Sequence, residues 1–149
     1  PPAPGDASLR PFEPPEMAEG SSSRPLRPLP FQRVVERDLV TGEVVYTLSS
    51  DGGEFGGHSL ARLEEIDLEL GYTLRKRHRM APFDPLTARS EIEQTALLRR
   101  GDWEVRLAST MSLAAAPRHL DFEAELRAHE GGDEVRVRRW QVKVPRRLF

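Results

Sequence analysis

The chain has 149 residues, no cysteine, and a net charge of −2 from 22 basic and 24 acidic residues. This length can bury one hydrophobic core but hardly two, and the near-neutral charge predicts no nucleic-acid or membrane partner. The lack of cysteine excludes disulfides, thiol catalysis and cysteine-based zinc sites. No apolar run approaches the roughly 18 residues that span a bilayer, and no signal-peptide layout is present. We therefore expect a cytoplasmic protein, and because residue 1 is Pro, a piece excised from a longer polypeptide.

Proline divides the chain near residue 30, because nine of its 13 prolines lie in the first 30 positions. Proline fixes φ and lacks an N–H donor, so this segment cannot join a sheet interior or form a long helix. The sequence predicts a Pro-rich extended arm or linker over 1–30 and a β domain over 31–149. An arm that lies along a neighbouring domain and a disordered tether both remain open.

From residue 31 onward, apolar and polar residues alternate as they do in strands. Segments 31–39 and 43–49 flank a short connection that contains Gly42, which predicts a hairpin. Leu68, Leu70, Tyr72 and Leu74 share one parity. Arg75, Arg77 and Arg79 have the opposite parity, and we expect them beside acidic rows that contain Asp67 and Glu69 or Glu91 and Glu93. Residues 81–85 predict a rigid crossing, and 91–100 predict the next strand.

The last third contains three long alternating segments, which begin at Trp103, Leu120 and Val135. A tight turn at Gly101-Asp102 precedes the first segment, and turns after Pro117 and at Gly131-Gly132 separate the three, which predicts an antiparallel meander with one apolar face. A change of parity at Arg138-Arg139 predicts a β-bulge in the last strand. The fold class that follows is all-β, an antiparallel β-sandwich or jelly-roll-like meander.

Four segments together resemble the C-terminal β region of cocaine-esterase-like (CocE/NonD) serine hydrolases, which are grouped with X-Pro dipeptidyl-peptidases. The resemblance spans roughly residues 31–149 and rests on the order and spacing of Val35-Glu36-Arg37-Asp38-Leu39 with Thr41-Gly42-Glu43, Asp84-Pro85-Leu86-Thr87-Ala88, Arg100-Gly101-Asp102-Trp103 with Val105-Arg106, and Trp140 with Val144-Pro145-Arg146-Arg147-Leu148.

This resemblance implies a jelly-roll domain that packs behind an α/β-hydrolase domain, which carries the Ser–Asp–His triad. The partner implied is that catalytic domain, and assembly of several copies is a further expectation. Because the triad belongs to the other domain, no catalytic residue can be assigned here by position. The chain also lacks the alternating βα pattern of a hydrolase core. We therefore expect a non-catalytic chain that has no cofactor.

Ser59 is the one candidate nucleophile, because Gly57-His58-Ser59-Leu60-Ala61 resembles the G-x-S-x-G nucleophile elbow. An elbow needs a buried strand before the serine and a helix after it. The preceding residues, 51–56, have a loop composition, whereas 60–66 are compatible with a helix that Ser59 would cap. A loop serine is the preferred interpretation.

Other polar residues give weaker signals. The four histidines, His58, His78, His119 and His129, have no paired-ligand spacing, so we expect no metal site. We expect His78 to pack on a strand and His119 and His129 to lie in turns. Asp51 and Glu54 offer too few oxygens for calcium. The basic residues near the C-terminus predict a solvated or ion-pairing surface; they are Arg136, Arg138, Arg139, Lys143, Arg146 and Arg147.

Two further hypotheses stay open beside the hydrolase-associated domain. A stand-alone β-sandwich could bind carbohydrate or protein through rim loops 50–58 and 81–88. A small esterase could use Ser59. Trp103, Phe122 and Trp140 would line a carbohydrate groove if they were exposed, but their parity places them in the core.

Overall fold

A computed structural model gives the fold, and it describes residue 16 and residues 22–27, 30–51 and 59–146. These residues form nine antiparallel strands and one short 3₁₀ turn, η2 (Glu64–Ile66). This arrangement confirms the predicted all-β antiparallel fold. The strands are β1 (Ser23–Arg27), β2 (Phe31–Arg37), β3 (Val44–Ser50), β4 (Leu60–Leu63), β5 (Leu68–Ala81), β6 (Asp84–Arg100), β7 (Trp103–Ala115), β8 (His119–Glu130) and β9 (Asp133–Pro145).

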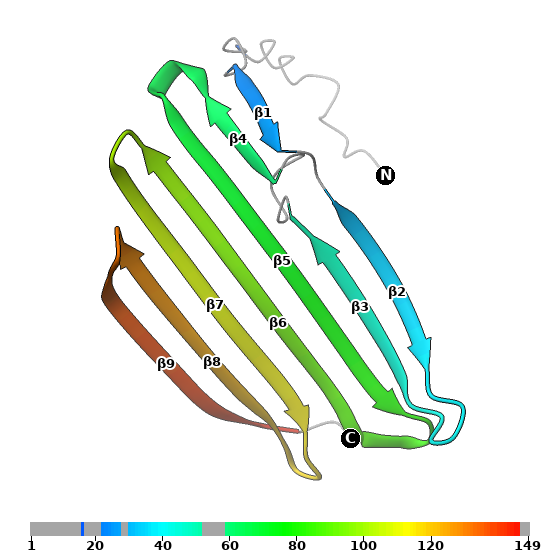
Figure 1. Cartoon of the computed structure of the whole chain (residues 1–149). Helices are drawn as coiled ribbons and strands as arrows, with labels where there is room; N and C mark the ends of the chain where they lie inside the picture. The colour runs from blue at the N-terminus through cyan, green and yellow to red at the C-terminus, as the bar shows by residue number, and fades with distance from the viewer. Residues whose placement is uncertain (1–15, 17–21, 28–29, 52–58, 147–149) are drawn as a thin grey trace, which may run out of the picture.

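All nine strands belong to one sheet; seven of them follow the order β1-β4-β5-β6-β7-β8-β9, and β2 and β3 lie off this path (Figure 1). Strand β5 is the centre of this arrangement, because β6 pairs along one of its edges while β4 and β3 pair with two halves of the other. Strand β2 then pairs with β3. The described residues thus form a single layer, and no second sheet or helix among them covers either side.

Part of the predicted Pro-rich arm joins this sheet, since Ser23–Arg27 pairs with β4 as strand β1. It does so at an edge, with Pro25 near a break in the register. An edge strand tolerates proline because a missing N–H on its outer side breaks no ladder hydrogen bond. The other residues of 1–30, apart from residues 16, 22 and 30, lie outside the described part of the chain.

Two predicted boundaries were wrong. Residues 81–85 do not form a rigid crossing and 81–88 do not form a rim loop, because β5 ends at Ala81 and β6 already begins at Asp84. The two residues between them make the turn, with Phe83 at φ 62°. Proline at the first central position and a positive φ at the second are features of a type II turn. The bulge in β9 is also displaced: the register shifts between Ala128 and His129 of β8, opposite Val135 rather than Arg138-Arg139.

Asp38 closes the β2–β3 hairpin, because its side chain accepts hydrogen bonds from backbone N–H groups of the turn. Its carboxylate accepts hydrogen bonds from the backbone N–H of Val40 at 2.7 Å and of Thr41 at 3.0 Å. These two donors lower the pKa of Asp38, because they stabilise its charged form. Gly42 completes the turn at φ 75°, and its N–H donates to the carbonyl of Asp38 at 2.8 Å.

Candidate functional site: two unlike faces of one sheet

Cross-strand register gives the sheet one apolar face and one polar face, because directly paired residues project to the same side. Trp140 on β9 pairs with Ala124 on β8, which pairs with Met111 on β7, and this row continues to Ile92 on β6. The residues of this parity define the apolar face. Its large apolar members are Phe31, Val35, Val44, Tyr46, Leu48, Leu63, Leu68, Leu70, Tyr72, Leu74, Met80, Ile92, Leu98, Trp103, Val105, Leu107, Met111, Leu113, Leu120, Phe122, Leu126, Trp140, Val142 and Val144.

The apolar face is uncovered within the described part of the chain. Leu74, which is 5% exposed, is the one hydrophobic residue there that is buried. Nine large side chains of the face keep 36–67% of their surface accessible: Phe31, Val35, Val44, Met80, Trp103, Leu113, Trp140, Val142 and Val144. At 150–250 Å² for a large side chain, they expose roughly 800 Å² together. The largest apolar patch on a typical monomer is about 300–600 Å².

Trp103 and Trp140 illustrate the difference between parity and burial. Both lie on the apolar face, as their parity predicts, yet they are 41% and 42% exposed, so the expected core position was wrong for them in this chain. Parity determines which side of a sheet a residue occupies, but burial requires a second layer. Phe122 lies on the same face and is partly buried.

A hollow of about 510 Å³ indents the apolar face near the β2–β3 and β5–β6 turns. Ala88 and Ser90 on β6 belong to its lining, and larger side chains on the strands at either side include Tyr46, His78 and Leu113. The rings of Tyr46 and His78 stack with centroids 6.0 Å apart. Small residues between large ones make a concave surface that can receive apolar side chains from a partner.

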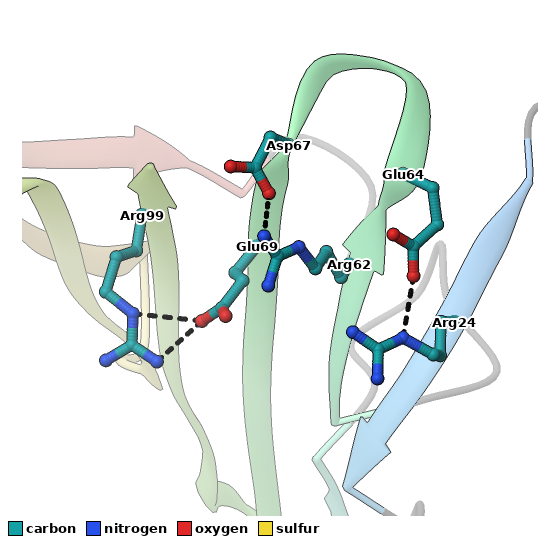
Figure 2. Close-up of polar contacts among 6 residues, drawn as sticks. All are labelled: Arg24, Arg62, Glu64, Asp67, Glu69 and Arg99. Carbon is teal, nitrogen blue, oxygen red and sulfur yellow. Dashed lines mark hydrogen bonds and ion pairs between the residues drawn. The ribbon is translucent and has the colours of Figure 1, made fainter. Parts of the chain in front are cut away.

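The polar face contrasts with the apolar one because its charges are largely paired with each other. Figure 2 shows one corner, where Arg24 on β1 contacts Glu64, Arg62 on β4 contacts Asp67, and Arg99 on β6 contacts Glu69 on β5. The Arg24–Glu64 and Arg99–Glu69 distances are 2.6 and 2.5 Å. The predicted ladder is present for two of its three arginines, since Arg77 lies opposite Glu91 and Arg75 opposite Glu93, whereas Arg79 lies opposite Arg89.

Glu125 on β8 is the carboxylate of this face that is shared by two arginines. It accepts hydrogen bonds from Arg127 on its own strand and from Arg139 on β9, the latter at 2.5 Å between Nε and Oε2. Both bonds hold the pKa of Glu125 below its ordinary value of 4.5, because they favour the charged carboxylate. Arg139, one of the basic residues near the C-terminus, therefore forms an ion pair between β9 and β8, as that part of the sequence predicted.

Glu125 predicts an acid-sensitive contribution to stability. A pKa that is lower in the folded state stabilises the fold above the unfolded pKa, near 4.5, and this contribution is lost as the pH falls through the folded value. The free energy of unfolding falls as the pH drops below about 4.5, and we expect Glu125→Gln to make this fall less steep. The slope should change by no more than the uptake of one proton on unfolding produces. Urea denaturation across the acid range measures the slope, and equal slopes in both proteins would contradict the prediction.

A shallow cavity of about 530 Å³ lies on the polar face above β7. Thr110 and Ser112 contribute small side chains between Glu91 and Glu93 on one side and Glu123 and Glu125 on the other. Gln141 donates a hydrogen bond to Glu123 at 3.1 Å, so part of this cavity's hydrogen-bonding capacity is already used within the sheet.

Ser59 does not lie in an elbow. Leu60–Leu63, which follows it, is strand β4 rather than the start of a helix, and Glu64–Ile66 is a 3₁₀ turn, so the helical alternative was wrong. Ser59 is 5% exposed, and its carbonyl accepts a hydrogen bond from the N–H of Tyr72 on β5 at 3.2 Å. Residues 52–58, which include His58 and Glu54, lie outside the described residues.

The three described histidines are separated across the sheet. His78 lies on a strand and stacks on Tyr46, but its side of the sheet is open to solvent, so it is not packed in an interior. His119 and His129 lie inside the ends of β8 rather than in turns, and their Nε2 atoms lie 3.1 Å from Asp121 and 3.8 Å from Glu134. Among the described residues, no group of three or more His, Asp or Glu side chains is arranged to hold a metal ion.

Comparison with known proteins adds no family to this description. No family model matches the chain, and neither a curated protein nor a solved structure matches it. Within the described residues, no helix is both long and apolar enough to cross a membrane. The chemistry of the two faces is therefore the basis for assigning a function.

Proposed function

We propose that this chain is the non-catalytic C-terminal β region of a CocE/NonD-like serine hydrolase, an acyl esterase or peptidase. In this proposal, the chain docks through its apolar face on an α/β-hydrolase domain that lies outside residues 1–149. The observation that carries the proposal is the uncovered apolar face, together with the four segments that resemble this family. The chain then supports the fold or assembly of the enzyme while a serine of the other domain performs acyl transfer.

A physical argument supports the need for a partner. The hydrophobic effect contributes about 25 cal/mol per Å² of apolar surface removed from water, and it dominates the stability of domains. The described strands bury few side chains fully, so most of this contribution is still available at the apolar face. Docking of a second layer on this face would make the usual two-layer architecture.

One specific observation favours the alternative of a stand-alone binding module for protein. Phe83 at the β5–β6 turn is fully exposed, and Leu39 and Val40 at the β2–β3 turn are more than nine-tenths exposed. The two turns are adjacent, because a Cβ added to Gly42 would lie 2.8 Å from Pro82. Exposed apolar residues on neighbouring loops are a common way to contact another protein.

A fluorophosphonate probe, which tags activated serines covalently, distinguishes these functions. We expect one adduct on the full-length gene product that contains this chain, at a serine outside residues 1–149, and no adduct on the chain alone. Peptide mapping by mass spectrometry locates the tag. A tag on Ser59 would make the chain an esterase, and a full-length product without any tag would favour the binding module.

A further inference from the structure

The apolar face carries positively charged side chains on its two edge strands, β2 and β9. Arg33 and Arg37 project from β2 at one edge, and Arg136 and Arg138 project from β9 at the other. We call these four residues the cationic rim. None of them makes an ion pair within the described part of the chain, although the guanidinium of Arg33 lies 4.9 Å from the centre of the Phe31 ring. The rim thus differs from the polar face, where most arginines have a carboxylate.

Acidic residues are almost absent from this face. Of the described strand residues, Glu130 and Asp133 are the carboxylates on the apolar face, and both lie at the turn between β8 and β9. Glu130 already accepts a hydrogen bond from the indole Nε1 of Trp103 at 3.0 Å. The apolar face therefore exposes roughly 800 Å² of apolar side chain, part of it on the edge strands β2 and β9, which also carry the unpaired cations. Lys76 on β5 is a further cation of this face, between Leu48 and Ile92.

We infer that the surface which covers this face is an apolar protein surface flanked by carboxylates that meet the cationic rim. This inference rests on the proposed function and specifies the surface of the hydrolase domain that docks there. Complementary charges at the edge of an interface set its orientation and exclude wrong partners. The apolar area fits such a contact, since a standard protein interface buries about 800 Å² on each partner.

A second copy of this chain is a poorer occupant. Two apolar faces in contact would bring the rim arginines of both copies against apolar or cationic surface, because the face has almost no carboxylate to offer. Burial of a cation without a partner is strongly unfavourable. An anionic membrane would satisfy the charges, but a flat bilayer would leave the hollow of about 510 Å³ on this face unfilled. Protein side chains can fill it.

The experiment compares three double variants of the full-length gene product by thermal unfolding. The rim variant is Arg136→Glu/Arg138→Glu. Its control, Arg106→Glu/Lys143→Glu, makes the same change of charge on the polar face. The ion pairs that it breaks, with Glu104 and Asp121, join side chains that are 60% and 72% exposed, where ion pairs contribute little to stability. The third variant, Val142→Thr/Val144→Thr, keeps shape and strand propensity but makes the apolar face more polar.

We expect the rim variant to lower the unfolding midpoint by about 5 °C or more at low salt, because like charges would then face each other across the contact. This difference should shrink in about 1 M salt, where the screening length is only about 3 Å. The control should change the midpoint by less than half as much. The threonine variant should also lower the midpoint, with little dependence on salt.

The outcomes separate the inference from the proposed function. If the threonine variant is destabilised and the rim variant behaves like its control, the face docks on a partner without acidic residues, and the inference is overturned while the proposed function stands. If neither variant differs from the control, both are overturned. Sedimentation of the isolated chain with phosphatidylglycerol vesicles, lost in the rim variant, would show a membrane as the occupant and would also overturn the inference.

Discussion

Leu74→Ala is expected to lower the free energy of unfolding by about 3 kcal/mol, the usual cost of removing a buried leucine side chain. Leu74 lies on β5 at the centre of the sheet, opposite Ser50 on β3 and Gln94 on β6. It is 5% exposed, and Ser50 and Ser59 nearby have the same low exposure. The junction where β3 ends and β4 begins against β5 is therefore the best-buried part of the described chain.

Leu113→Ala is the matched control for this prediction. Leu113 lies on the same face, on β7, but it is 36% exposed, so the same truncation removes less buried surface and leaves no enclosed cavity. We expect a cost of about 1 kcal/mol for the isolated chain. Urea denaturation followed by circular dichroism measures both values. Equal costs would mean that another surface covers Leu113 as completely as the sheet covers Leu74.

Gly42→Ala is expected to lower the free energy of unfolding by about 2 kcal/mol, for two separate reasons. The residue has φ 75°, which is unfavourable for any residue with a Cβ by roughly 1–2 kcal/mol. In addition, the new Cβ would lie 2.8 Å from Cγ of Pro82, a contact that requires the β2–β3 and β5–β6 turns to separate.

Gly131→Ala isolates the first of these effects, the cost of a positive φ. Gly131 has φ 59° in the β8–β9 turn, but a Cβ there would meet nothing within 4 Å. We expect a cost of about 1 kcal/mol from the backbone alone. Urea denaturation of both variants gives the difference, which measures how tightly the two turns are packed. A Gly131 variant as unstable as the Gly42 variant would show that this packing contributes nothing.

Alternation predicted most of the sheet because strand parity depends only on local sequence. The apolar parity of the Trp103 and Leu120 strands, the Gly42 hairpin and the Arg75–Glu93 pairing follow from period-2 patterns and from glycine at turns. The position of the bulge was missed because Arg138 has the parity of Trp140 and therefore faces apolar Leu126. The sequence-based prediction assumed that charged residues lie on the polar face, and it therefore could not place Arg138 on the apolar one.

The candidate site was harder to predict because it is a property of the whole sheet. The cationic rim combines residues of β2 and β9, which lie at opposite edges and about one hundred positions apart in the sequence. Their common side follows only from the register of every strand between them. One signal was available in the sequence: Arg33 and Arg37 share parity with Phe31 and Val35, which marks arginines on an apolar side.

The central role of β5 has a consequence for the order in which the chain folds. Strands β5 to β9 each pair with their neighbour in sequence through short turns, so these hairpins close small loops at little entropic cost. Strand β3, in contrast, must find β5 across β4 and the residues between them. Local contacts form fastest in sheets of this kind. The C-terminal meander would therefore form first and provide the template on which the β2–β3 hairpin, itself a local pairing, is added as a unit.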